Sequence, residues 1–142
     1  GEEDYKITGS WFKQKVGGVL EKEKAAYLDI WQTLNEHIVQ VESGINEKER
    51  NRLLKARFSG FIEGFERLYF THNKLIVSDD SLCRDMRVLV KEKFLHRYSN
   101  FFETYSIVQF SKKKQDEYVK YKPEKVEGMI NELFEPPVQS YS

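Results

Sequence analysis

The sequence predicts an all-α protein that folds as an up-and-down antiparallel bundle of about four main helices. Apolar residues recur at steps of three and four along four segments, which is the spacing of one face of an α-helix. No segment of useful length alternates apolar and polar residues as a β-strand would. Aromatic residues make up 14% of the 142 residues, which suits a single folded domain with a core rather than a disordered chain.

The first main helix is predicted to follow the Gly17-Gly18 pair and to extend to about Val41. Its apolar face consists of Leu20, Tyr27, Trp31, Leu34, Ile38 and Val41, and Lys24 is the one interruption. A short helical turn around Trp11 and Phe12 is expected before the glycines. We therefore assign residues 1–18 to an N-terminal segment and begin the bundle at residue 19.

Asn46 and Glu49 predict the start of the second helix, because an Asn N-cap with Glu three residues later forms a capping box. The apolar face consists of Leu54, Phe58, Phe61, Phe65 and Leu68, widened by Leu53, Ile62 and Tyr69. We expect the core to bury five aromatic side chains together: Phe58, Phe61, Phe65, Trp31 and Phe101.

Residues 71–78 are predicted to be a loop, with Leu75, Ile76 and Val77 packed beneath it. Ser78 or Asp79 is expected to cap the third helix. The apolar face of this helix consists of Leu82, Met86, Leu89, Val90, Phe94, Tyr98, Phe101 and Tyr105.

Residues 106–121 lack a helical period and are predicted to be a second connection. Pro123 suits the first position of a fourth helix, since the N–H that proline lacks has no partner there. This helix is expected to bury Val126, Met129, Ile130, Leu133 and Phe134 and to stop at Pro136-Pro137. The bundle then spans residues 19–134, and residues 135–142 form a flexible tail.

The residues that carry catalytic or metal chemistry are isolated from one another. Cys83 is the single cysteine, which excludes an internal disulfide and a cysteine metal cluster and suits a reducing cytoplasmic compartment. His37, His72 and His96 fall in different predicted elements and have no second ligand at metal-binding spacing. We therefore expect no enzymatic activity, no metal and no cofactor.

The overall charge also limits the partners. Lys plus Arg equals Asp plus Glu at 23 each, so no global field favours nucleic acid, and we expect none to bind. No apolar run approaches the roughly 18 residues of a membrane-spanning helix, so contact with a membrane is expected to be peripheral. Because the chain opens on Gly1, we expect it to be part of a longer protein.

The segment QFSKKKQDEYVKYK, residues 109–122, carries a local surplus of positive charge. Five lysines stand there against two carboxylates: Lys112, Lys113, Lys114, Lys120 and Lys122. Each lysine near an anionic membrane contributes about 1 kcal/mol of attraction. Phe110, Tyr118 and Tyr121 either anchor the segment to the bundle or contact the membrane interface. The alternative is a solvated loop with no binding role.

Four segments in order resemble the seventy-kilodalton exocyst subunit family, also called exocyst complex component seven. EYVKYKPEKVEGMINELF, residues 117–134, is similar to the closing signature of the family. NEKERNRLLKARFSGFIEGFERL, residues 46–68, and FLHRYSNFF, residues 94–102, resemble its two preceding helices. AYLDIWQTLNEHI, residues 26–38, is a looser match, and the resemblance is strongest to animal members.

The resemblance implies a rod of stacked helical bundles, with this chain as the distal C-terminal bundle. It also implies a role in tethering secretory vesicles to the plasma membrane, with phosphatidylinositol bisphosphate bound by basic residues at this end. The matching positions are Lys120, between two tyrosines, and Lys55, in LKARF. Animal members often carry lysine where this chain has Glu117 and glutamate where it has Ala56, so we expect residues 112–114 to supply the missing charge.

The favoured function is a non-catalytic membrane-targeting module, cytoplasmic and peripheral at the plasma membrane. The candidate lipid-binding residues are Lys120, Lys55, Lys112, Lys113, Lys114 and Lys122. The expected partners are an anionic phosphoinositide membrane surface and other exocyst subunits. The alternative is a protein-docking module for other exocyst subunits, a Rho-type small GTPase or an actin-nucleating factor.

Overall fold

The computed structural model describes residues 17–75 and 79–134, and the side chains from residue 23 onward within them. The predicted turn at Trp11 and Phe12, the packing of Ile76 and Val77, and the tail lie outside this part. The elements are α2 (Gly17–Gln32), the 3-10 helix η2 (Thr33–Glu36), α3 (Glu47–His72), α4 (Asp80–Tyr105), α5 (Gln115–Tyr118) and α6 (Pro123–Ile130). Within the described ranges there is no strand, and the predicted all-α class is confirmed.

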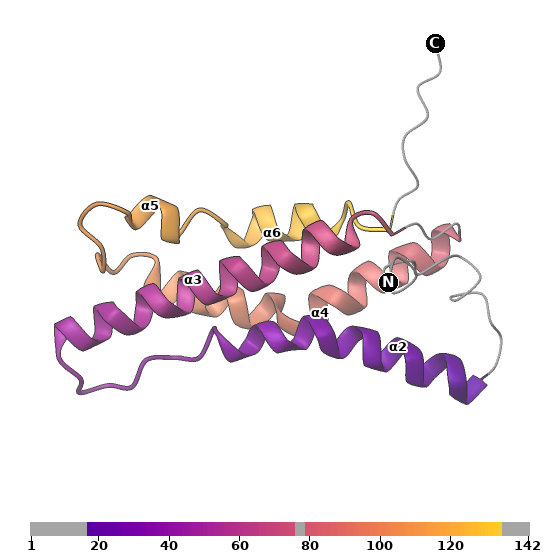
Figure 1. The fold of residues 1–142 in the computed structure, drawn as a ribbon, viewed down its shortest axis with the longest axis horizontal. Helices are drawn as coiled ribbons and strands as arrows, with labels where there is room; N and C mark the ends of the chain where they lie inside the picture. The colour runs from indigo at the N-terminus through magenta and orange to yellow at the C-terminus, as the bar shows by residue number, and fades with distance from the viewer. Residues whose placement is uncertain (1–16, 76–78, 135–142) are drawn as a thin grey trace, which may run out of the picture.

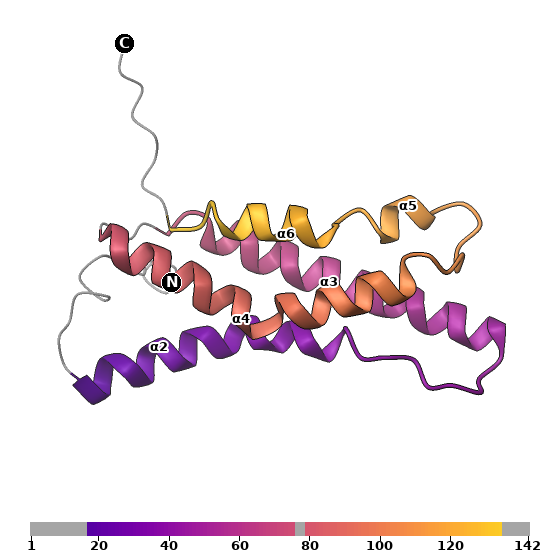
Figure 2. The same ribbon diagram turned by 180° about the vertical axis from the view of Figure 1, so that it is seen from behind.

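The long helices run up and down the bundle. In Figure 1, α3 and α4 cross the molecule in opposite directions, with α2 along one side and α5 and α6 along the other. Seen from behind in Figure 2, the same order holds, and α4 packs against both α2 and α6. The connection from α4 to α5 lies at the same end of the bundle as the start of α3 (Figure 1).

Aromatic side chains from three helices form the core. Trp31 of α2 lies 6.4 Å from Phe65 of α3 between ring centroids, and Phe61 stacks on Phe65 at 5.8 Å. Phe58 contacts Phe101 of α4 at 5.0 Å. All five rings are buried, so the predicted aromatic core is confirmed.

Three helices start as the sequence predicts, two with a side-chain cap and one with a proline. The Asn46 side chain accepts a hydrogen bond of 2.8 Å from the backbone N–H of Glu49. Asp79 accepts a bond of 2.9 Å from the backbone N–H of Leu82, and Pro123 occupies the first position of α6. The two side-chain caps satisfy backbone donors that have no partner inside the helix.

The first main helix is shorter than predicted at its C-terminal end. α2 ends at Gln32 and η2 at Glu36, whereas the apolar spacing predicts helix to Val41. Two tertiary hydrogen bonds draw the chain out of the helix. The Asn35 amide donates to the backbone carbonyl of Lys93 at 2.8 Å, and the backbone N–H of Val41 donates to the Tyr105 hydroxyl at 2.8 Å. At its other end α2 includes both Gly17 and Gly18, slightly earlier than predicted.

The second helix is longer than predicted. α3 continues to His72, inside the segment predicted to be a loop, because the His72 ring is buried and bonds to the Tyr27 hydroxyl at 2.8 Å. Leu75, the described member of the apolar residues beneath the loop, is buried as predicted.

The last helix ends at Ile130 rather than at Pro136, and the predicted non-helical connection contains the single-turn helix α5. Beyond Ile130, the N–H groups of Glu132 and Leu133 bond three residues back, which tightens the chain into turns. Phe134 adopts φ 68°, and this turn places Leu133 and Phe134 in the core. Burial of these two side chains therefore replaces continuation of the helix.

Candidate functional site

The basic segment is anchored to the bundle by its aromatic residues. Phe110 is buried and stacks on Phe58 with ring centroids 5.2 Å apart. Tyr118 meets the edge of Phe110 at 5.5 Å, and Tyr121 packs edge-on against Phe65 at 5.6 Å. Of the two roles predicted for these aromatic residues, the contacts support anchoring of the segment to the bundle, since all three rings pack on it.

One side chain, Gln115, closes the loop of residues 106–115. Its carbonyl oxygen accepts bonds from the backbone N–H groups of Phe110 at 3.2 Å and Ser111 at 3.1 Å. Its amide nitrogen donates to the carbonyls of Val108 at 2.9 Å and Ser106 at 3.4 Å. Because four backbone groups share one amide, the loop has a fixed backbone from which its lysines extend.

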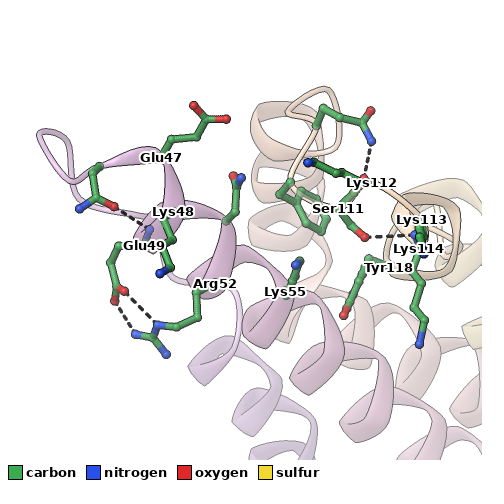
Figure 3. Close-up of a pocket in the computed structure, with 14 residues that line it drawn as sticks. Glu47, Lys48, Glu49, Arg52, Lys55, Ser111, Lys112, Lys113, Lys114 and Tyr118 are labelled. Carbon is green, nitrogen blue, oxygen red and sulfur yellow. Dashed lines mark hydrogen bonds and ion pairs between the residues drawn. The ribbon is translucent and has the colours of Figure 1, made fainter.

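The loop faces the first turns of α3 across a groove of about 1040 Å³ (Figure 3). Three cationic side chains come from α3 and three from the loop. We call this surface the basic groove; its cations are Lys48, Arg52, Lys55, Lys112, Lys113 and Lys114. Figure 3 shows Lys55 between α3 and the loop, so the structure brings it together with the three loop lysines.

The carboxylates of the basic groove only partly offset its positive charge. Glu49 and Glu47 line it, and Glu49 is paired with Arg52 through two hydrogen bonds, one of them 3.0 Å long. The bond from Arg52 lowers the pKa of Glu49, so this carboxylate stays ionised. Within residues 17–75 and 79–134, no ion pair engages the five lysines of the groove. Its exposed lysines are therefore available to an anion.

Lys120 belongs to a different cluster. Its ammonium nitrogen lies 3.3 Å from a carboxylate oxygen of Glu66, and also 5.1 Å from the centroid of the Tyr121 ring. The Tyr121 hydroxyl donates to the same Glu66 oxygen at 2.6 Å, and burial together with this bond raises the pKa of Tyr121 to about 12. Glu66 is about three helical turns beyond Lys55 on α3. The structure thus separates Lys120 from the basic groove.

Lys122 is exposed at the residue before α6 and does not line the basic groove. Of the six lysines predicted as a lipid-binding set, four line one groove and two lie outside it. Lys48 and Arg52 were not among the predicted residues, although with Lys55 they recur at steps of four and three, which places them on one helical face. Gln115 and Glu66 gave no sequence signal, because their partners are distant backbone groups and side chains.

The other candidate chemical residues are dispersed. His72 is buried against Tyr27, the ring of His37 lies against Gly60, and Cys83 is buried. In the described part of the chain, no group of three or more His, Cys, Asp or Glu side chains is placed to hold a metal ion. No described helix is both long and apolar enough to cross a bilayer.

The fold and the site define an α-helical bundle whose distinctive surface is an open groove lined by cations. The family profile for the C-terminal region of the Exo70 exocyst complex subunit, Exo70_C, matches residues 3–132. The chain therefore belongs to the Exo70 family of exocyst proteins, in its C-terminal region.

Relatives from plants and animals match at similar identity. The chain is 29% identical to Exocyst complex component EXO70C1 of Arabidopsis thaliana over 89% of its length, and 31% identical to Exocyst complex component 7 of Drosophila melanogaster over 82%. It is 26% identical to Exocyst complex component 7 of Homo sapiens over 82% of its length. The matches cover 19%, 18% and 16% of those relatives, so the chain spans less than a fifth of their length.

Proposed function

We propose that this chain is the membrane-docking module of an exocyst subunit, and that its basic groove binds anionic phosphoinositide headgroups. The observation that carries the proposal is the convergence of Lys55 with residues 112–114 across one groove. These lysines come from elements about sixty residues apart in sequence, yet they face a common volume. A single headgroup with several phosphates suits such a site, because each lysine can approach a different phosphate oxygen.

The charge of the groove sets the strength of binding. Each lysine near an anionic surface contributes about 1 kcal/mol, so Lys55 and the three loop lysines together give several kcal/mol of attraction. This is enough for reversible docking, and it is screened by salt because the side chains are exposed. Phosphatidylinositol bisphosphate is the proposed ligand, since its headgroup concentrates more charge than a lipid with one phosphate.

In the cell, we propose that docking through this groove places the exocyst at the cytoplasmic face of the plasma membrane and helps to tether secretory vesicles during exocytosis. The remaining length of the family's proteins is proposed to contact the other exocyst subunits. The chain itself acts by binding, without catalysis.

A protein-docking role is the second candidate, and exposed apolar side chains favour it. Phe70 at the end of α3 is 55% exposed, and Val88 on α4 is 49% exposed. Both lie far along their helices from the basic groove and suit an apolar contact. Another exocyst subunit, a Rho-type GTPase or an actin-nucleating factor is the candidate partner. Such binding would survive high salt and depend on Phe70, whereas lipid binding would not.

Co-sedimentation with vesicles tests the lipid proposal. The variant Lys55→Ala, Lys112→Ala, Lys113→Ala, Lys114→Ala is expected to bind vesicles containing phosphatidylinositol bisphosphate at least about a hundredfold more weakly. The matched control replaces four lysines outside the groove: Lys74, Lys91, Lys93 and Lys125. If the control loses as much affinity as the groove variant, general charge rather than the groove explains binding.

A further inference from the structure

Ile107 is the most exposed large apolar side chain in the described part of the chain, at 84% of its surface. The other exposed large apolar residues there range from 41% to 55%. It lies in the connection between α4 and α5, in the same loop as three of the lysines of the basic groove, Lys112, Lys113 and Lys114. An apolar side chain this exposed loses favourable burial energy unless it has a partner.

The hydrogen bonds of Gln115 hold the backbone on both sides of Ile107. The Gln115 amide donates to the carbonyls of Ser106 and Val108, the two neighbours of Ile107 in the chain. Phe110, three residues on, is fixed in the core against Phe58. Ile107 is therefore held outward by a fixed backbone, and reaching the core would require breaking these bonds.

The same amide also places Ile107 near the lysines. The Gln115 side-chain oxygen accepts a hydrogen bond from the backbone N–H of Ser111, the residue directly before Lys112. Gln115 therefore holds the backbone of residues 106–108 close to that of residues 110–111. This loop lies at one end of the bundle (Figure 1), and both Ile107 and the three lysines at 112–114 are exposed on it. A bilayer surface offers partners for both, since anionic headgroups lie directly above the acyl-chain boundary.

We propose that the loop of residues 106–115 is a two-part membrane contact, in which Ile107 enters the acyl-chain boundary while Lys112, Lys113 and Lys114 hold the headgroups. The inference rests on the proposed lipid function and adds a second contact, between Ile107 and the acyl-chain boundary of the bilayer. A soluble headgroup would use the lysines and leave Ile107 in water.

The first test compares Ile107→Ser with wild type on two ligands: vesicles containing phosphatidylinositol bisphosphate, and soluble inositol trisphosphate. The serine variant is expected to bind vesicles about fivefold more weakly, because partial burial of an isoleucine is lost, and to bind inositol trisphosphate as wild type does. Ile107→Leu is expected to restore vesicle binding. Val88→Ser, on an exposed site of α4 away from the loop, is the matched control and should bind as wild type.

The second test detects insertion directly. Ile107→Trp in a Trp11→Phe background leaves Trp31, which is buried, as the other tryptophan. On vesicles with brominated acyl chains, the fluorescence at position 107 is expected to shift to shorter wavelength and to be quenched, while Val88→Trp is not. Wild-type binding with an unquenched Trp at position 107 overturns insertion and leaves headgroup docking standing. Failure of the wild type to bind vesicles overturns both proposals.

A second copy of this chain is the rival occupant for Ile107. If analytical ultracentrifugation shows a dimer that Ile107→Ser abolishes, and vesicle binding is unchanged, Ile107 belongs to a protein contact and the membrane proposal is wrong.

Discussion

The ammonium group of Lys120 lies 3.3 Å from the carboxylate of Glu66, and this ion pair holds Lys120 apart from the basic groove. The family resemblance places Lys120 at the centre of lipid binding, whereas its geometry gives it a partner within the bundle. Lys120 remains 47% exposed, so the pair is weak and open to competition from other anions. Glu66 is therefore expected to limit the contribution of Lys120 to the proposed lipid binding.

Replacing Glu66 with Gln is expected to strengthen vesicle binding by about two- to fivefold, because the change frees Lys120 and removes a carboxylate that repels anionic lipid. Vesicle affinity at low salt measures this. The double variant Glu66→Gln, Lys120→Ala should bind more weakly than Glu66→Gln alone. Equal affinity of the two variants would show that Lys120 takes no part.

The end of η2 packs closely on α3 at Gly60. A Cβ atom there would overlap the His37 ring, with His37 Cε1 only 3.0 Å away. Gly60→Ala is therefore expected to lower the free energy of unfolding by about 1–2 kcal/mol, although alanine favours helix by about 1 kcal/mol. Urea denaturation measures the change.

Gly128 of α6 provides the control, because a Cβ atom there has nothing within 4 Å. Gly128→Ala is expected to raise stability by about 0.5–1 kcal/mol. Combining Gly60→Ala with His37→Ala should recover much of the loss. If Gly60→Ala stabilises the chain as Gly128→Ala does, the close packing of His37 on α3 is wrong.

The buried His72 makes stability depend on pH. Burial lowers the pKa of His72 to about 4, and the ring bonds to the Tyr27 hydroxyl, which itself accepts from the Trp31 indole N–H at 3.2 Å. Between pH 6.5 and 4 the unfolded chain binds a proton at this residue that the folded chain does not. The titration of His72 therefore leaves the free energy of unfolding unchanged above pH 6.5. Below that, the free energy of unfolding falls as the pH drops, by about 3 kcal/mol once both states are protonated.

Denaturation of wild type and of His72→Gln across pH 4 to 7 isolates this effect. The glutamine variant should lose less stability over the range, because the titrating group is gone. Parallel pH profiles for the two proteins would contradict the assignment to His72.

Phe61 is the central aromatic of the core, fully buried and stacked on Tyr98 at 3.9 Å. Phe61→Ala is expected to cost about 3–5 kcal/mol of unfolding free energy through lost burial and the cavity left behind. Phe70→Ala is the matched control, since Phe70 is more than half exposed and should change stability by less than about 1 kcal/mol. Equal effects at the two positions would mean that the helical phase of α3 is wrong.

Features that depend on neighbouring residues were predictable from the sequence. The caps at Asn46 and Asp79 lie within three residues of their partners, and the apolar spacing of α3 identifies Phe58, Phe61 and Phe65. The end of the first helix was wrongly predicted, because it is set by contacts from Lys93 and Tyr105 in α4. The spacing of apolar residues in the sequence gives no information about those tertiary contacts.

In the candidate site, too, local features were predictable from the sequence and tertiary ones were not. The three consecutive lysines at 112–114 form a local charge surplus that composition reveals, and the family resemblance adds Lys55. The packing of α3 against the loop brings these lysines together in one groove. It also places Glu66 where it forms an ion pair with Lys120, outside the groove. The anchoring of that loop by Gln115 is likewise tertiary, because the four bonds form only when the loop closes.

The central claim is that α3 and the loop form one lipid site, and Lys55→Ala tests it most directly. Its affinity for vesicles containing phosphatidylinositol bisphosphate, measured at low salt beside Lys74→Ala, is expected to fall about fivefold while the control is unchanged. Wild-type affinity for Lys55→Ala would contradict the claim, since the α3 wall of the basic groove would then contribute nothing.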